Sequence, residues 1–153
     1  MSTHTITYVQ GDATQPIGPS PQIIIHVCND VRKWGAGFVL ALTRRFGLQP
    51  KKQFLAMEPR LGTVGLVNVG NNVYVANMIA QHGVGRSNPK LDYKALEACL
   101  HTVFATAQYH KCTLHGPMFG AGLAGGNWNK IAAMLQKMCQ KYSTSITIYQ
   151  YGR

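Results

Sequence analysis

Acidic residues are scarce in this chain, which has five Asp and Glu against 15 Lys and Arg in 153 residues. The sequence contains no cluster of carboxylates of the kind that binds Mg²⁺. We therefore expect no obligatory metal ion and no cofactor. The formal net charge of +10 would attract phosphorylated ligands and nucleic acid alike. The basic residues are not interleaved with aromatic ones as in a base-stacking surface, which favours an ordinary solvated basic surface.

Long apolar runs, paired cysteines and repeats are also missing. No apolar run is long enough to span a bilayer and the first residues do not resemble a secretory signal, so we expect a cytoplasmic protein without membrane association. The cysteines are widely spaced within apolar patterns, which favours reduced core thiols over disulfides or zinc: Cys28, Cys99, Cys112 and Cys139. No linker divides the chain, and its length suits a single domain over residues 1–153.

Glycine, by contrast, is abundant, and two glycine-rich loops each follow a strand pattern and precede a helix pattern. His115 to Trp128 has five glycines in fourteen residues, and Trp34 to Phe38 carries Gly35 and Gly37. Such loops let the backbone approach a ligand and leave N–H groups at a helix N-terminus, where an anion is favoured. Because strand ends meet at one edge of an α/β sheet, the loops predict one cleft that holds two phosphates.

Periodicity predicts the remaining elements. Strands are expected over Thr5 to Gln10, Gln22 to Val27, Val64 to Val69, Val73 to Ile79, Lys111 to His115 and Ser145 to Tyr151. Helices are expected over Gly37 to Phe46, from Pro50 through Met57, after Asp92 as N-cap, and along the apolar stripe from Ile131 to Tyr142. The turn Gly70-Asn71-Asn72 predicts an antiparallel hairpin in an otherwise parallel sheet. The expected order is therefore β-β-α-α-β-β-α-β-α-β.

Four motifs, in this order along the chain, resemble the macrodomain family. They are Gly11-Asp12-Ala13-Thr14, His26-Val27-Cys28-Asn29, Gly35-Ala36-Gly37, and Gly120-Ala121-Gly122-Leu123-Ala124-Gly125-Gly126. The resemblance covers almost the whole chain and is closest to the compact branch of yeast-type ADP-ribose-1''-phosphate phosphatases and terminal ADP-ribose glycohydrolases. It implies a three-layer α/β/α fold with a mixed, mostly parallel central sheet, which binds the diphosphate of ADP-ribose between the two glycine loops.

The resemblance also implies roles for ligand-binding residues. Asp12 would accept a hydrogen bond from the adenine amino group, although an Asx turn fits the local sequence equally well. Tyr149 would stack on the adenine, and Tyr151 lies on the same face of the final strand as an alternative. Asn29 would bind the distal ribose. The other expected ligand-binding residues are Ala13, Trp34, Gly35, Ala36, Gly37, Phe119, Gly120, Ala121, Gly122, Leu123, Ala124 and Gly125.

The candidate catalytic residues are His26, Asn29 and Asp30, at the end of the second strand. The pKa of histidine suits a general acid or base, but a histidine in an apolar strand is also commonly a hydrogen-bonded core residue. His82 is a further candidate. The glycohydrolase pattern is incomplete, because Gln81-His82 stands where that group has a lysine, and Ala124 where it has an aspartate.

These features are interpreted as a hydrolase that acts on an ADP-ribose derivative, with ADP-ribose-1''-phosphate as the expected substrate and ADP-ribose and phosphate as products. One alternative is a non-catalytic reader of ADP-ribose. Others are a deacylase or de-ADP-ribosylating hydrolase, and a basic module that binds RNA or poly-ADP-ribose weakly through its surface.

Overall fold

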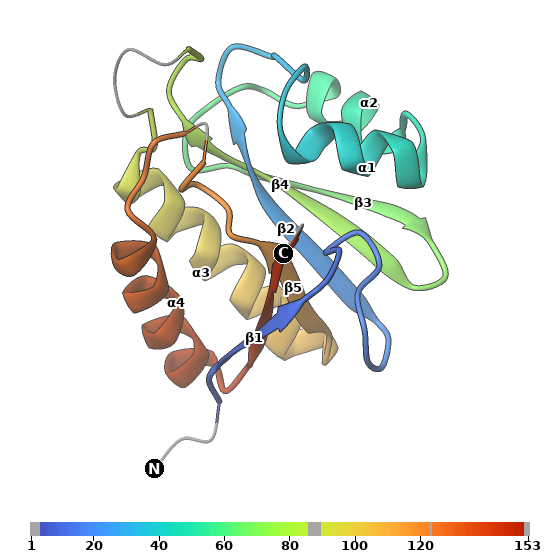
Figure 1. The fold of residues 1–153 in the computed structure, drawn as a ribbon, viewed down its shortest axis with the longest axis vertical. Coiled ribbons are helices and arrows are strands. Elements are labelled where there is room, and N and C mark those ends of the chain that lie inside the picture. The colour runs from blue at the N-terminus through green and yellow to red at the C-terminus, as the bar shows by residue number, and fades with distance from the viewer. Residues whose placement is uncertain (1–3, 86–89, 123, 152–153) are drawn as a thin grey trace.

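The computed structural model describes residues 4–85, 90–122 and 124–151, which form one mixed sheet with helices on both faces (Figure 1). The strands are β1 (Ile6–Gln10), β2 (Gln22–Asn29), β3 (Val64–Gly70), β4 (Val73–Gln81), β5 (Thr113–Pro117) and β6 (Ile146–Gln150). The helices are α1 (Phe38–Phe46), α2 (Gln49–Ala56), α3 (Tyr93–His110) and α4 (Trp128–Tyr142). Their order along the chain confirms the predicted one.

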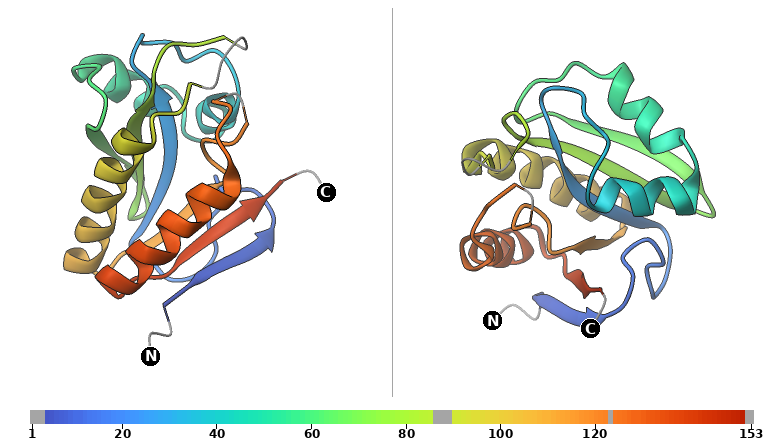
Figure 2. Two further views of the ribbon diagram at one scale, coloured as in Figure 1. Left: turned by 90° about the vertical axis from the view of Figure 1, so that its left-hand side faces the viewer. Right: turned by 45° about the horizontal axis from the view of Figure 1, so that its top comes forward.

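The sheet has the strand order β1-β6-β5-β2-β4-β3, and only the β3–β4 pair is antiparallel. Helices α1 and α2 cover one face and α3 and α4 the other, so the predicted three-layer α/β/α architecture is confirmed (Figure 2). Asn71 and Asn72 both have positive φ, 54° and 58°, as a tight hairpin turn between β3 and β4 requires.

Strand β2 lies inside the sheet, between β5 and β4, and this position explains its run of β-branched residues. Side chains alternate across a sheet, so Ile23 and Ile25 join the apolar cluster beneath α3 and α4, while Ile24 joins the cluster beneath α1 and α2. All three are at most 2% exposed. The strand is thus buried on both faces.

Two strand ends differ from those predicted. Strand β2 continues two residues beyond Val27, because Cys28 and Asn29 pair with Ile79 and Gln81 of β4. Strand β5 begins at Thr113 because Lys111 adopts a left-handed conformation, φ 58°, that ends α3. These shifts follow from pairing partners and a helix cap, which local periodicity does not report.

The cysteine interpretation is confirmed for three of the four residues. All four thiols are free; Cys28, Cys99 and Cys139 are buried and Cys112 is partly buried. Burial raises the pKa of Cys28 well above its ordinary value, so this thiol stays protonated and unreactive. Within the described part of the chain, no helix is both long and apolar enough to cross a membrane.

Candidate functional site

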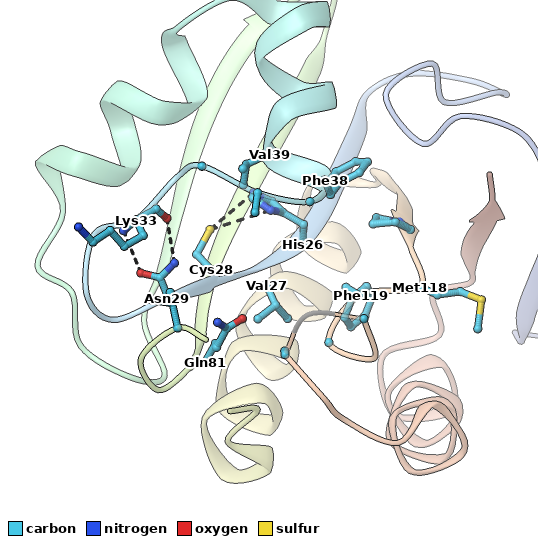
Figure 3. Close-up of a pocket in the computed structure, with 18 of the residues that line it drawn as sticks. His26, Val27, Cys28, Asn29, Lys33, Phe38, Val39, Gln81, Met118 and Phe119 are labelled. Atoms are coloured by element: carbon cyan, nitrogen blue, oxygen red, sulfur yellow. Dashed lines mark hydrogen bonds between the residues drawn. The ribbon is translucent and has the colours of Figure 1, made fainter. Parts of the chain in front are cut away.

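The carboxyl-terminal edge of the sheet contains two adjoining cavities that form one cleft. The larger, about 650 Å³, lies between the end of β2, the loop into α1, the end of β4 and the β5–α4 loop (Figure 3). The smaller, about 550 Å³, lies between the β1–β2 loop, α1 and the end of β6. Gly37, Phe38 and Pro117 line both, and so mark where they join.

The N-terminus of α1 lies at this junction. Its N-cap is Gly37, with φ 82°, so no side chain caps the helix, and its first turn has no acidic residue. No described residue accepts a hydrogen bond from the main-chain N–H groups of residues 35–39. Unpaired donors at the positive end of a helix dipole form an anion-binding site.

The second glycine loop differs from the prediction. Asn127 caps α4, and its Oδ1 accepts hydrogen bonds from the N–H groups of Asn129 and Lys130 at 2.8 and 3.4 Å, so this helix N-terminus is already satisfied. The loop is closed on itself by a 2.8 Å bond from the Gly126 N–H to the Gly120 carbonyl. The anion site predicted at both helix N-termini is therefore available at α1 alone, and the second loop contributes the wall formed by Phe119, Gly120 and Gly122.

The structure brings most of the expected ligand-binding residues to the cleft. Asn29, Gly35, Ala36, Gly37, Phe119, Gly120, Gly122 and Ala124 line the larger cavity, and Asp12, Ala13 and Tyr149 line the smaller one. Leu123 lies outside the described residues. Ala121 and Gly125 are not among the lining residues: Ala121 packs against the core, and the Gly125 N–H bonds to the Gly122 carbonyl.

Trp34 was expected to bind ligand, and the structure places it in the core instead. Its indole N–H donates to Thr43 Oγ1 at 2.9 Å, and its ring packs against Phe54 at 5.4 Å between centroids. The side chain is 8% exposed and lines neither cavity. A large apolar ring beside an amphipathic helix gains more from burial under that helix than from exposure in a loop.

His26 lines the larger cavity but is held as a neutral core residue. It is 1% exposed, and its Nε2 lies 2.5 Å from Asn77 Oδ1. The Asn77 amide nitrogen donates to Pro50 O and Gln53 Oε1, so its oxygen is the acceptor and His26 carries the proton on Nε2. Burial lowers the pKa of His26 to about 4, against the opposing effect of this hydrogen bond. The geometry supports the core-residue alternative over an acid or base at neutral pH.

Asn29 organises the loop that follows β2. Its Oδ1 accepts from the N–H groups of Val31 and Lys33 at 3.1 and 3.0 Å, and its Nδ2 donates to the Lys33 carbonyl at 2.8 Å. Figure 3 shows the amide facing this loop. One N–H of Nδ2 remains to bind a ligand in the cavity that Asn29 lines.

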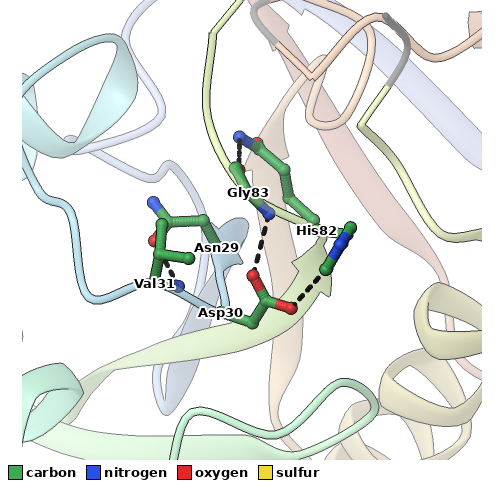
Figure 4. A network of polar contacts seen from close by, with 6 residues as sticks. Asn29, Asp30, Val31, His82 and Gly83 are labelled. Atoms are coloured by element: carbon green, nitrogen blue, oxygen red, sulfur yellow. Dashed lines mark hydrogen bonds and ion pairs between the residues drawn. The ribbon is translucent and has the colours of Figure 1, made fainter.

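Asp30 connects the end of β2 to the segment after β4 (Figure 4). It is not among the residues that line the larger cavity. Its Oδ1 accepts from the Gly83 N–H and its Oδ2 lies against His82 Nδ1, both at 2.8 Å. Burial alone would raise the pKa of Asp30, but the hydrogen bonds from Gly83 and His82 outweigh it and lower the pKa. The two candidates Asp30 and His82 therefore pair with each other, next to Asn29 and Gln81 of the cavity lining.

The smaller cavity brings together residues far apart in the sequence. Asp12 Oδ1 accepts from the N–H and the hydroxyl of Thr14 at 2.8 and 2.7 Å, the Asx turn that local sequence had favoured equally, while the carboxylate also lines the cavity. Tyr149 is 3% exposed and its hydroxyl bonds to Ile17 N–H and His115 Nδ1. Tyr151 lines the same cavity and is 76% exposed.

Sequence reasoning missed three cationic residues that line the cleft. Arg44 and Arg45 line the smaller cavity and Lys33 the larger one. A signal was present for the arginines, because they follow Ala41 by three and four residues on the predicted helix and share its face. Among the described residues, no group of three or more His, Cys, Asp or Glu could hold a metal ion.

The solved structures to which this chain is similar share its fold. No family model matches the chain. A solved protein of unknown function from Bacteroides thetaiotaomicron is 38% identical with a TM-score of 0.91, covering 97% of this chain and 99% of that one. A macrodomain protein from Streptomyces coelicolor is 36% identical with a TM-score of 0.83, covering 96% and 99%. DarTG of Thermosipho africanus, solved in complex with ADP-ribose, shares the fold at 16% identity, with a TM-score of 0.74 over 98% of this chain and 42% of that one.

Two curated relatives are more distant in sequence. Mouse chromodomain-helicase-DNA-binding protein 1-like is 29% identical over the whole chain, which spans only 18% of that protein's length. Human ADP-ribose glycohydrolase OARD1 is 24% identical, covering 94% of this chain and 90% of that protein.

Proposed function

Because the chain belongs to the macrodomain family, we propose that its cleft binds ADP-ribose with the diphosphate at the N-terminus of α1. The observation that carries this proposal is the uncapped helix end at the junction of two cavities. Each cavity is then left for one nucleoside-sized half of the ligand. Two similar proteins, one solved in complex with ADP-ribose and one an ADP-ribose glycohydrolase, support the choice of ligand.

The two halves of the ligand would be oriented by the polar residues at each end. Asp12, in the smaller cavity, would accept from the adenine amino group through the carboxylate oxygen that the Asx turn leaves unused. Tyr151, with its exposed ring, would stack on the adenine, while the buried Tyr149 would support it from below. Asn29 would direct its remaining N–H to the distal ribose.

A calorimetric titration with ADP-ribose tests the binding proposal. We expect one molecule bound per chain, and weaker binding of adenosine monophosphate, which lacks the second phosphate and the distal ribose. Absence of binding by the folded protein would refute the proposal.

We also propose that the chain hydrolyses an ADP-ribose derivative, with ADP-ribose-1''-phosphate as the candidate substrate. A water oxygen would attack phosphorus while the bond from phosphorus to the ribose oxygen breaks, and that oxygen would leave protonated, giving ADP-ribose and inorganic phosphate. Lys33 and the free main-chain N–H groups at the N-terminus of α1 would offset charge on the transferred phosphoryl group. Positioning by Asn29 would supply much of the remaining rate enhancement.

Hydrolysis of a ribose–glutamate bond through a lysine adduct is less well supported. Gln81-His82 stands where the resembling group has its lysine, and Gln81 lines the cavity with its amide nitrogen bonded to the Gly83 carbonyl. Ala124, where that group has an aspartate, is 5% exposed and has no ionisable group.

A non-catalytic reader is favoured by one observation. Among the described residues that line the larger cavity, none is Asp or Glu, and its one histidine, His26, has a pKa lowered to about 4 by burial. A cavity without a carboxylate and with a neutral histidine offers few groups to move protons at neutral pH.

Release of phosphate from ADP-ribose-1''-phosphate, without added metal, separates these two functions. A phosphatase should release phosphate, and Asn29→Ala should lower kcat because the distal ribose is no longer held for in-line attack. If the wild-type protein binds ADP-ribose but releases no phosphate, the phosphatase is refuted and the reader is favoured.

A further inference from the structure

We propose that Arg44 and Arg45 form a subsite for an additional phosphate carried by the adenosine ribose of the ligand. The preferred ligand would then be an ADP-ribose phosphorylated on its adenosine side, such as 2'-phospho-ADP-ribose. This inference rests on the proposed binding of ADP-ribose and adds a specificity to it.

Helix α1 places the arginines at a defined distance from the anion site. On α1 the residues Phe38, Ala41, Arg44 and Arg45 line the cleft from one helical face that runs from the first turn to the last. Gly37 precedes them as the N-cap, and Val39 lines the larger cavity from outside that face. Arg45 follows Phe38 by seven residues, which is about 10 Å along the axis at 1.5 Å per residue. That span is close to the length of one nucleoside, so a ligand whose diphosphate lies at the N-terminus would bring its adenosine to the arginines.

The charge around the smaller cavity suits a second anion. Both arginines are exposed, and in the described residues the ion pairs are Arg60–Glu58 and His82–Asp30, so neither has an acidic partner. Asp12 is the one acidic residue among the described residues that line this cavity, and its Oδ1 already accepts hydrogen bonds from Thr14. Guanidinium groups bind phosphate through paired N–H donors, which suits two adjacent arginines to one phosphate dianion.

Two simpler roles for these arginines make different predictions. Cations in the last turn of a helix stabilise it through the helix dipole, which would affect unfolding but not ligand preference. A guanidinium stacked on adenine would strengthen binding of ADP-ribose and its phosphorylated form equally. Only a phosphate subsite makes the difference between the two ligands depend on the arginines.

Calorimetric titrations with ADP-ribose and with 2'-phospho-ADP-ribose, at about 0.15 M salt, test the proposal. We expect the phosphorylated ligand to bind about tenfold more tightly, the size of one added charge-assisted interaction. Arg44→Gln and Arg45→Gln should each remove most of this preference while ADP-ribose still binds. Lys52→Gln is the matched control, because it removes the same charge from an exposed position on α2 that lines neither cavity.

The outcomes separate this subsite from the proposed function. Equal affinity of the wild-type protein for both ligands would overturn the subsite and leave ADP-ribose binding intact, whereas binding of neither ligand would overturn the proposed function itself. An equal loss for both ligands in the arginine variants would assign them to adenine stacking. Competition by a short single-stranded RNA with a steep salt dependence would assign them to nucleic-acid binding and would also overturn the subsite.

Discussion

At the scale of single residues, burial decides what His26 can do. It lies on the face of β2 that points toward α1 and α2, with its ring 5.7 Å from that of Trp34. Its hydrogen bond to Asn77 fixes the proton on Nε2 and links β2 to the α2 residues that hold the Asn77 amide. His26 is therefore a buried polar residue that links the strand to the helical layer, and its burial keeps it neutral in the folded chain at neutral pH.

The neutral state of His26 predicts how stability depends on pH. Its folded pKa of about 4 lies below its ordinary value of 6.5, so between these values the unfolded chain binds a proton that the folded chain does not. Stability should therefore fall as pH falls from about 6.5 toward 4, and His26 should account for about 2 kcal/mol of loss between pH 7 and about pH 5.

Urea unfolding at both pH values measures this effect. His26→Gln keeps a donor for Asn77 without a titrating group, so its free energy of unfolding should change less with pH than that of the wild-type protein. His115→Gln is a useful companion, because burial lowers the pKa of His115 to about 4 as well and the two effects should add. An unchanged pH dependence in His26→Gln would show that the histidine is not buried neutral.

The Asp12 carboxylate has two roles: one oxygen stabilises the Asx turn, and the carboxylate is proposed to contact the ligand. A single substitution can separate these roles. Asp12→Asn retains an oxygen for the Thr14 N–H and hydroxyl but loses the charge offered to the adenine amine. We expect this variant to keep wild-type stability and to bind ADP-ribose about 1 to 3 kcal/mol more weakly, measured by calorimetry. The inosine analogue, which lacks the amine, should bind the wild-type protein more weakly than ADP-ribose, and equal affinities would remove Asp12 from the adenine site.

At the scale of elements, the cleft depends on the contrast between two helix N-termini. The α4 end is closed by Asn127, whereas the α1 end is left open by Gly37. The glycine loop before α4 has a different role, since its turn packs against Leu91 and Ile131 on one side and presents Gly122 to the cleft on the other. Glycines of the same loop therefore serve folding and binding separately.

Valine substitutions in this loop should separate those roles. A Cβ on Gly122 meets nothing within 4 Å, so Gly122→Val should fill ligand space and abolish ADP-ribose binding while the thermal midpoint changes little. A Cβ on Gly126 would lie 2.6 Å from the Gly120 carbonyl oxygen and closer still to Leu91, so Gly126→Val should lower the midpoint.

Gly125→Val should also lower the thermal midpoint, because the φ of +75° at Gly125 disfavours a β-branched residue. Gly125 does not line the cleft, so this variant is expected to resemble Gly126→Val. Calorimetry and thermal unfolding of the three variants measure both effects. Normal binding by Gly122→Val would place the phosphates elsewhere.

At the scale of the whole molecule, the two apolar layers share one sheet. Ile24 belongs to the layer beneath α1 and α2, and its neighbours Ile23 and Ile25 belong to the layer beneath α3 and α4. Neither layer can open without exposing β2, which is also the strand whose end carries Asn29 to the cleft. We therefore expect the chain to unfold as one cooperative unit, as the predicted single domain over residues 1–153 would.

The two tryptophans allow this cooperativity to be measured. Trp34 lies in the layer beneath α1 and α2, and Trp128 packs against the opposite layer. Urea transitions of Trp34→Phe and Trp128→Phe, each followed by the fluorescence of the remaining tryptophan, should coincide in shape with the circular dichroism of the same variant. Separate transitions for the two probes would indicate two independently folding layers.

Ligand binding should also stabilise the whole domain. ADP-ribose at about 100 times its Kd should raise the free energy of unfolding of the wild-type protein by about 2.7 kcal/mol.

The sequence by itself determined the elements, their order and the two glycine loops. Alternation and helical spacing depend on residues within a few positions of each other, so β2, the β3–β4 hairpin and the Asp92 cap were predictable from local chemistry. The three-layer fold followed from that order together with the resemblance of the motifs.

The tertiary structure alone decided which side chains face the cleft. Asp12, Arg44 and Tyr149 line one cavity because the strand order places β1 beside β6, and the cavity lies between the loop after β1, the end of β6 and α1. The same packing buried Trp34 and lowered the pKa of His26, and both effects depend on neighbours that are distant along the chain or supplied by another layer. The burial of a side chain, its protonation state and its place in the cleft depend on contacts between residues far apart in the sequence. Whether a segment forms a helix or a strand depends mainly on contacts between near neighbours. This difference in range separates what the sequence predicted from what it did not.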